Sequence, residues 1–171
     1  YNRDYLIAHH ILVYHEFPLV GPEGGFGAAG ASPAYFYFLT LPLLMKDSII
    51  FLGLFNVFLQ MVSLFFVYLL GRMMFGKAVG LGALALFAAN ENIIYQSNFV
   101  WQPHVMQPFL LLSIFLLFIS YTRKSYPLLL LSIAGFVFAS VLHQSVIALA
   151  PFYLIAVLLV LYANPKQSWR H

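Results

Sequence analysis

The chain has 171 residues, of which 63% are hydrophobic and 8% charged, and its mean hydropathy is +0.90. Soluble domains carry about one quarter charged residues, so this composition excludes a water-soluble core and indicates an integral membrane protein. The formal net charge of +3 comes from cations spaced between apolar runs, which does not favour nucleic-acid binding. The chain contains no cysteine, and this excludes a disulfide framework and a thiolate metal site.

Residues 1–47 are predicted to form a loop that does not cross the membrane. A short surface helix is predicted over 4–16, with Ile7, Ile11 and Tyr14 on one face. The glycine-rich segment that follows it is typical of a loop.

A second surface helix is predicted over 34–45. Ser32 is its predicted N-cap and Pro33 its first helical residue, whereas Pro42 is expected to break it. The helix is too short to span a bilayer, and its aromatic residues fit an interfacial anchor.

Residues 48–162 are predicted to form an all-α transmembrane bundle. A membrane-spanning helix needs about 20 apolar residues. The predicted spans are 48–70, 78–94, 105–121, 127–142 and 146–162. The apolar stretch that begins near 127 is too long for one span, so a turn is placed at His143 and Gln144. The expected fold is therefore a polytopic helix bundle with about five spans and two surface helices.

The charges predict an orientation for this bundle. Most cations fall in three clusters, namely Arg72 with Lys77, Arg123 with Lys124, and Lys166 with Arg170. The positive-inside rule assigns these clusters, and the end segment 163–171, to the cytoplasm. The acids lie in or next to the other connections: Asp4, Glu16, Glu23, Asp47 and Glu91. We therefore expect the chemically active groups at the outer face. The chain begins without an initiator Met and stops in a basic loop, which we interpret as an internal piece of a longer protein.

Asp4 and Arg3 are the first candidate site residues. A carboxylate is favoured at the start of a helix by the helix dipole, and Asp4 there suits a general base or a metal ligand. The alternative is an ordinary N-cap. Arg3 suits a phosphate contact, or it is a charge partner of the neighbouring acid.

The remaining candidates lie near the predicted outer turns. Glu91 is either cavity-lining or simply interfacial. Trp101 and Gln102 belong to a polar segment at the membrane boundary, where Trp is common as a belt residue. His104 and His143 suit donors to a phosphate or hydroxyl, with a solvated loop position as the alternative.

Two further patterns concern the packing of the helices. Asn56, Gln60 and Ser63 share one face of the first span, which is typical of hydrogen bonding between helices and, second, of a cavity lining. Gly76 and Gly80 form a G-x-x-x-G pair that allows close helix packing.

Several motifs occur in an order that resembles a known family. They are Arg3-Asp4-Tyr5, Pro18-Leu19-Val20-Gly21-Pro22, Ser32-Pro33-Ala34-Tyr35-Phe36-Tyr37-Phe38, Gly71-Arg72-Met73-Met74-Phe75-Gly76, Ser97-Asn98-Phe99-Val100-Trp101-Gln102-Pro103 and Leu142-His143-Gln144-Ser145. Together they resemble the membrane half of GT-C superfamily glycosyltransferases, specifically bacterial relatives of the dolichyl-phosphate-mannose protein mannosyltransferases. The likeness covers nearly the whole chain, and the order of the motifs carries more of it than any single motif.

The resemblance implies a sugar transferase of the bacterial cytoplasmic membrane that works at its outer face. Its donor would be a polyprenyl-phosphate sugar, and its acceptor a glycan, lipid or protein. Asp4 would be the family's acid of the first outer loop, activating the acceptor or helping to hold a divalent cation. Many relatives carry a second acid directly afterwards, where this chain has Tyr5.

Other functions stay open at this point. A transporter or flippase for lipid-linked saccharides would use broken helices and polar groups near the middle of the membrane. An inactive membrane scaffold is a third possibility. The enzyme hypothesis predicts that Asp4, His104 and His143 surround one outward-opening cavity, whereas a transporter predicts a path through the bundle.

Overall fold

The computed structural model describes residues 2–22, 32–97 and 100–163, and this part of the chain is helical without strands. The elements in chain order are α1 (Asn2–Val13), α2 (Ala34–Met45), α3 (Ile49–Phe75), α4 (Lys77–Ala88), α5 (Glu91–Ser97), α6 (Gln102–Arg123), α7 (Tyr126–Leu142), the 3-10 helix η2 (Gln144–Leu149) and α8 (Ala150–Ala163). The all-α fold expected from composition and periodicity is confirmed.

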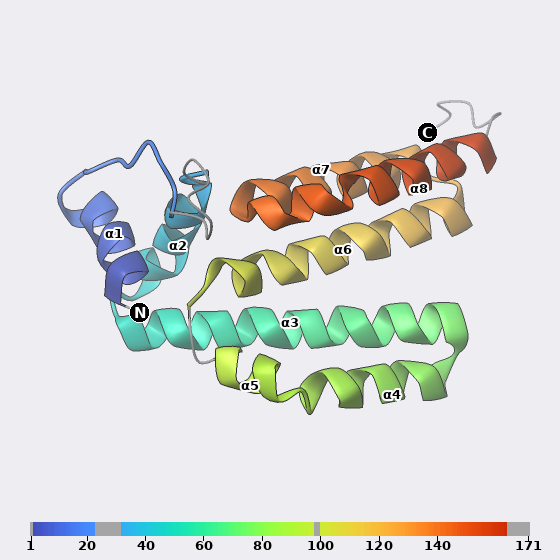
Figure 1. Cartoon of the computed structure of the whole chain (residues 1–171), viewed down its shortest axis with the longest axis horizontal. Coiled ribbons are helices and arrows are strands. Elements are labelled where there is room, and N and C mark those ends of the chain that lie inside the picture. Colours follow the sequence, from blue (N-terminus) through green and yellow to red (C-terminus); the bar gives the residue numbers. More distant parts are fainter. Residues whose placement is uncertain (1, 23–31, 98–99, 164–171) are drawn as a thin grey trace.

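The long helices lie side by side and form one bundle (Figure 1). α3 and α6 run in the same direction, because Gln60 contacts His104 and, further along both helices, Phe66 contacts Phe115. α4 returns antiparallel to α3, and α7 returns antiparallel to α6. We define the head as α1, α2 and the described residues of the two connections α1–α2 and α2–α3. The head lies at one end of this bundle.

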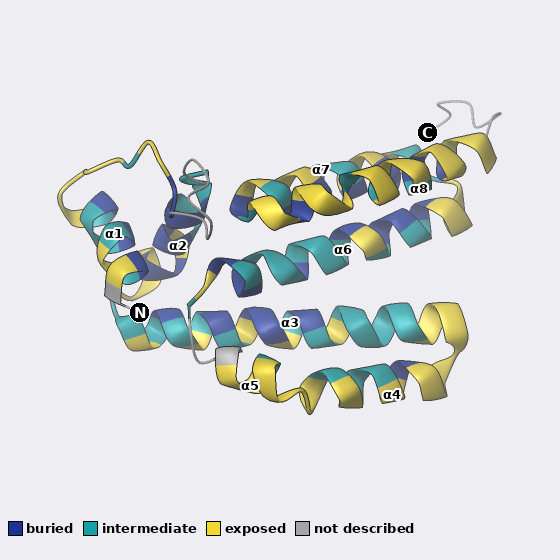
Figure 2. Ribbon diagram, in the orientation of Figure 1, coloured by how far each residue is buried: buried dark blue, intermediate teal, exposed yellow. Residues whose placement is uncertain are grey.

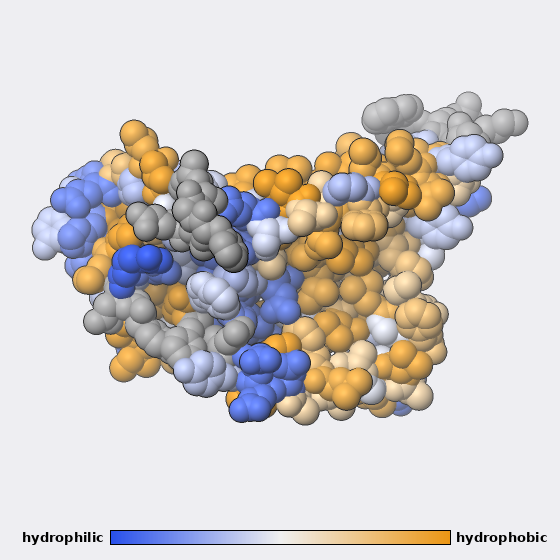
Figure 3. Space-filling view, in the orientation of Figure 1, coloured by the Kyte–Doolittle hydropathy of each residue, from blue (hydrophilic) through white to orange (hydrophobic). Residues whose placement is uncertain are grey.

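Among the described residues, three helices are long and apolar enough to cross a membrane. They are Ile49–Phe75, Gln102–Arg123 and the combined segment Gln144–Ala163. Exposed side chains cover the outer faces of α4 and α8 (Figure 2), and hydrophobic residues dominate the surface of the bundle (Figure 3). Soluble monomeric proteins rarely expose so large an apolar surface, so the fold is compatible with an integral membrane protein.

The helix predicted over 34–45 is confirmed as α2. Ser32 Oγ accepts a hydrogen bond from the backbone N–H of Ala34 at 3.2 Å, but the N-cap of α2 is Pro33 and not the predicted Ser32, so Pro33 precedes the helix instead of being its first residue. The expectation that Pro42 breaks this helix is wrong, since α2 continues through a buried Pro42 to Met45.

The first surface helix is also present, but its buried face differs from the predicted one. Ala8 and Ile11 are buried against α2, whereas Tyr14 is exposed and lies beyond the end of α1. The predicted face of Ile7, Ile11 and Tyr14 is therefore not the buried one, because the buried face of α1 consists of Asp4, Ala8 and Ile11.

The predicted span 78–94 is not one continuous helix. α4 ends at Ala88 and α5 begins at Glu91. Asn90 lies between them, and its side-chain oxygen accepts hydrogen bonds from the backbone N–H groups of Asn92 and Ile93. Asn90 therefore caps α5, which starts a new helix where the sequence predicted the end of a span.

A close backbone contact joins α3 to α4. A Cβ atom on Gly80 would lie 2.7 Å from the backbone nitrogen of Arg72, and one on Gly71 would lie 2.9 Å from Gly80 Cα. Of the predicted pair Gly76 and Gly80, only Gly80 makes a close contact between helices. Gly76 instead has a φ of +96° and separates the two helices, so the partner of Gly80 is Gly71.

The contact between α6 and α7 uses side-chain hydroxyls. Ser113 Oγ donates to the backbone oxygen of Ser132 at 2.8 Å, and Ser132 Oγ donates to the backbone oxygen of Ser113 at 2.7 Å. The Tyr153 hydroxyl of α8 contacts both serines. These groups satisfy one another inside an apolar bundle, where unpaired polar groups are costly.

The charged connections separate to opposite ends of the bundle. The α3–α4 and α6–α7 turns, which carry Arg72, Lys77, Arg123 and Lys124, lie at the end away from the head (Figure 1). The head and α5 carry the described acids. Glu23, Lys166 and Arg170, and with them the segment 163–171 beyond its first residue, lie outside the described residues.

Candidate functional site

The head is built by packing one face of α1 against α2. Asp4, Ala8 and Ile11 lie one helical turn apart and are buried, and Asp4 is only 8% exposed. The neighbouring face, with Arg3, Ile7 and His10, lines a cavity. The 3.6-residue repeat of the helix thus places two adjacent residues, Arg3 and Asp4, on different faces of α1.

Asp4 lies in the first turn of α1 and makes two polar contacts. Its Oδ1 accepts a hydrogen bond from Arg3 Nε at 2.9 Å, and its Oδ2 accepts one from the Tyr35 hydroxyl at 3.1 Å. Burial and the adjacent Asp4 carboxylate raise the pKa of Tyr35 far above its usual value, so Tyr35 remains a neutral donor. The Asp4 side chain thus contacts α2, which a simple N-cap would not do.

A second carboxylate fastens the head to α3. Asp47 precedes α3 and accepts a hydrogen bond from the Tyr5 hydroxyl at 3.0 Å. His9 Nδ1 lies 2.7 Å from the other carboxylate oxygen of Asp47. Tyr5 therefore links α1 to the segment that leads into α3.

The first turn of α6 is polar and buried. Gln102 is 7% exposed and His104 is 5% exposed. The Gln60 side chain of α3 donates a hydrogen bond to the backbone oxygen of His104 at 3.0 Å. Hydrogen bonding between helices, the first reading of the polar face on α3, is confirmed for Gln60. Trp101 is half exposed, and its ring lies 5.7 Å from that of His104.

The other polar turns lie at the same level of the bundle. α3 and α4 are antiparallel, and Gly80 lies against Gly71. Asn90, ten residues after Gly80, therefore lies level with Met61, which is ten residues before Gly71 and next to Gln60. Ser113 lies against Ser132, and the same reasoning places His143, eleven residues after Ser132, level with Gln102, two residues before His104. We call this level, with Gln60, Asn90, Gln102, His104 and His143, the polar level.

His143 and Glu91 differ in their surroundings at the polar level. His143 joins α7 to η2, as predicted for the turn, and burial lowers its pKa below the usual 6.5. Glu91 is exposed at the start of α5. Of the two readings of Glu91, cavity-lining and interfacial, this exposure fits the interfacial one.

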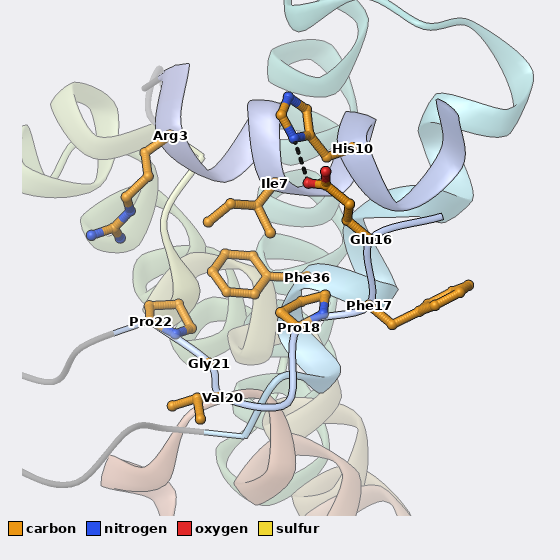
Figure 4. Close-up of a pocket in the computed structure, with 10 residues that line it drawn as sticks. All are labelled: Arg3, Ile7, His10, Glu16, Phe17, Pro18, Val20, Gly21, Pro22 and Phe36. Carbon is orange, nitrogen blue, oxygen red and sulfur yellow. Dashed lines mark hydrogen bonds and ion pairs between the residues drawn. The ribbon is translucent and has the colours of Figure 1, made fainter. Parts of the chain in front are cut away.

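A cavity of about 740 Å³ opens between α1, the segment 16–22 and the start of α2. Arg3 lies at one end of it, the His10–Glu16 pair at the other, and Ile7 and Phe36 between them (Figure 4). His10 Nδ1 and Glu16 Oε2 are 2.9 Å apart. The volume is in the range of about 300–1,000 Å³ that is typical of ligand pockets.

The sequence-predicted residues are therefore only partly brought together. Arg3 lines the cavity, but Asp4, His104 and His143 are not among its lining residues. The expectation of one cavity around Asp4, His104 and His143 is not met by this cavity. Apolar packing connects the head, which carries Arg3 and Asp4, with the part of the bundle that carries His104 and His143. Buried side chains of α1, α2, α3, α6 and α7 form one cluster there.

The surroundings of Asp4 do not fit a divalent cation. Within residues 2–22, 32–97 and 100–163, no group of three or more His, Asp or Glu side chains is placed to hold one metal ion. Divalent cations need several oxygen ligands, whereas the nearest charged partner of Asp4 is the guanidinium of Arg3.

Sequence reasoning missed Tyr35 as the partner of Asp4 and the cavity itself. The contact between Tyr35 and Asp4 joins residues 31 positions apart, and no local pattern predicts it. A sequence feature could have indicated the cavity, because one of the motifs quoted above supplies four of its lining residues: Pro18, Val20, Gly21 and Pro22.

Comparison with known proteins gives no match: no family model fits the sequence, and neither a curated protein nor a solved structure is significantly similar to it.

Proposed function

We propose that this chain belongs to a membrane glycosyltransferase of the GT-C type, which transfers a sugar from a polyprenyl-phosphate donor at the outer face of a bacterial cytoplasmic membrane. The observation that carries the proposal is the placement of Asp4. Its carboxylate is held by a neutral phenol and an arginine in a head that packs on one end of an apolar helix bundle. The order of the sequence motifs supports the same class.

In the proposed reaction, Asp4 is the general base. The acceptor, a hydroxyl of a glycan, lipid or protein, attacks the anomeric carbon of the donor sugar and gives its proton to Asp4. The bond between that carbon and the phosphate oxygen breaks, and its electron pair goes to the phosphate. A carboxylate has about four lone-pair sites, and two contacts leave Asp4 able to accept a proton. Arg3, His104 and His143 are the proposed groups for the phosphate charge.

The depth of the polar level supports an enzyme that works at a membrane boundary. α6 starts at this level and its 22 residues extend about 33 Å, enough to cross a hydrocarbon core of about 30 Å. α7 ends there and η2 begins there. The polar residues therefore lie at the end of these helices rather than at their middle.

The test is transfer by the full-length protein with the substitution Asp4→Asn. We expect transfer from a polyprenyl-phosphate sugar to fall by about 100-fold or more, because general bases contribute about 10²–10⁴-fold. Asp47→Asn is the matched control, since Asp47 is also a head carboxylate bound by a tyrosine. Unchanged transfer in Asp4→Asn, with folding intact, would refute the role of Asp4.

One observation favours a transporter or flippase of lipid-linked saccharides as the second candidate. The chain between Lys77 and Ser97 is a broken helix, and broken helices are common in transporters. Reconstituted vesicles separate the two functions. Movement of a lipid-linked saccharide across the bilayer without an acceptor would favour transport, whereas glycosidic bond formation without such movement would favour the enzyme.

A further inference from the structure

We infer that Phe38 of α2 is a positioning residue, which sets where the Asp4 carboxylate lies relative to the polar level. The inference rests on the proposed function, because Phe38 acts through Asp4. An apolar ring takes no part in proton transfer, so its role is to hold other groups in place. The basis is that a single helix, α2, carries both the phenol that binds Asp4 and the ring that meets the bundle.

The Phe38 ring lies where α2 meets three helices of the bundle. Its centroid is 5.9 Å from that of Phe55 in α3, 5.4 Å from that of Phe109 in α6 and 6.0 Å from that of Phe138 in α7. The rings of Phe109 and Phe138 meet it at 88° and 67°, close to the edge-to-face arrangement that aromatic pairs favour. Contacts with three helices restrain the ring in several directions, which a single contact would not do.

Two of these contacts lie close to the histidines of the polar level. Phe109 follows His104 by five residues in α6. Phe138 precedes His143 by five residues in α7. A helix rises 1.5 Å per residue, so both phenylalanines lie about 7.5 Å along their helices from these histidines. Phe38 therefore contacts the same ends of α6 and α7 that carry the proposed phosphate-binding histidines.

The same helix also holds Asp4. Tyr35 lies three residues before Phe38 in α2, and its hydroxyl donates to Asp4 Oδ2 at 3.1 Å. Tyr35 is fully buried, and α2 lies between α1 and the near ends of α6 and α7 (Figure 1). Residues three apart are neighbours on a helix surface, so Tyr35 and Phe38 move together. A shift of α2 on the bundle would thus displace the carboxylate from the polar level.

The connection between α2 and α3 leaves this placement to packing. α2 ends at Met45 and α3 begins at Ile49, and the cap residues Lys46 and Ser48 have extended backbones. An extended connection limits the distance between two helices but does not fix the angle between them. The contacts of Phe38, about two helical turns before the connection, supply that constraint.

Spin-label distances in the full-length protein test the placement of the head without turnover. The 171 residues contain no native cysteine, so Leu6→Cys in α1 and Leu130→Cys in α7 provide exposed labelling positions in the head and the bundle. Phe38→Leu, which removes the ring and keeps an apolar side chain, is expected to widen the distance distribution. Phe66→Leu is the matched control and should leave it unchanged, because the partly buried Phe66 ring contacts Phe115 between α3 and α6.

Transfer kinetics measure what the placement contributes to the reaction. In Phe38→Leu we expect kcat to fall about tenfold or more with little change in the KM of the donor, because a misplaced base weakens the transition state alone. In an Asp4→Asn background, Phe38→Leu should cause no further loss, since it acts through Asp4. Phe66→Leu should leave kcat per folded molecule unchanged in both backgrounds.

Three results would overturn the inference. They are an unchanged distance distribution in Phe38→Leu, a widened distribution with unchanged kcat, and losses of kcat that add between Phe38→Leu and Asp4→Asn. Failure of the proposed function has a different signature, namely full transfer by Asp4→Asn. The distance distribution then still decides whether Phe38 fixes the head on the bundle, because it is measured without transfer.

Discussion

The head and the helix bundle use their polar groups in different ways. In the bundle, hydroxyls pair with one another and close glycine contacts bring backbones together, as in the Ser113–Ser132 and Gly71–Gly80 contacts. In the head, carboxylates are held by tyrosines, as in Asp4–Tyr35 and Asp47–Tyr5, and keep unused lone pairs. In the Ser113–Ser132 contact both hydroxyls bind the backbone of the facing helix, whereas the head contacts fix the orientation of carboxylates.

This difference predicts two classes of variant. Changes in the bundle should lower the free energy of unfolding and leave transfer per folded molecule unchanged. Changes around Asp4 should lower transfer more than they lower stability. The predictions that follow test this division.

The largest effect is expected for Gly80→Ala. The new Cβ would lie 2.7 Å from the backbone nitrogen of Arg72, so α3 and α4 must separate. Overpacking of this kind costs about 1–3 kcal/mol in the free energy of unfolding. Thermal unfolding in detergent measures it, and Gly82→Ala, with nothing within 4 Å of its Cβ, is the control. A fall in transfer per folded molecule in Gly80→Ala would contradict the division.

Next in size is Tyr35→Phe, which removes the hydroxyl that donates to Asp4 Oδ2. We expect transfer to fall about tenfold, equivalent to about 1.4 kcal/mol, because the carboxylate loses a contact that orients it. Tyr37→Phe is the control, since the Tyr37 hydroxyl on the same helix donates to the backbone oxygen of Pro18 at 2.8 Å. Equal losses of transfer in both variants would show that Tyr35 has no special role.

A smaller effect is expected for the serine pair of α6 and α7. Ser113→Ala and Ser132→Ala each remove one hydrogen bond between helices, and such bonds contribute about 0.6 kcal/mol on average inside membranes. A double-mutant cycle on the free energy of unfolding measures their coupling. Ser140→Ala is the control, because Ser140 bonds only within its own helix to the Phe136 oxygen. Additive single effects would mean that the two bonds are independent.

The smallest effect concerns pH. The pKa of His143 is lowered below 6.5 by burial, so the unfolded chain binds its proton at a higher pH than the folded chain does. The contribution to stability is complete above pH 6.5 and is lost as the pH falls below that value. His143→Asn should therefore flatten the dependence of the unfolding midpoint on pH below 6.5. The same slope in both proteins would contradict this role of burial.

The sequence predicted those features that depend on local pattern. The turn at His143 followed because an apolar stretch that leaves and returns to a basic side must cross twice. The break between α4 and α5 was missed because its apolar run suggested one span, although Asn90 was a possible cap. The Asp4–Tyr35 contact was not predictable, since it depends on how α1 and α2 pack, and a helical pattern specifies faces but not partners.

The length of α3 has a consequence for the height at which the head operates. Its 27 residues extend about 40 Å, whereas a hydrocarbon core is about 30 Å thick. The stretch from Ile49 to Gln60 precedes the polar level and extends about 16 Å beyond it. α3 therefore sets the distance, along the bundle, between the head and the polar level. One helical turn inserted before Gln60 would increase this distance by about 5.4 Å and separate the head from the residues of the polar level.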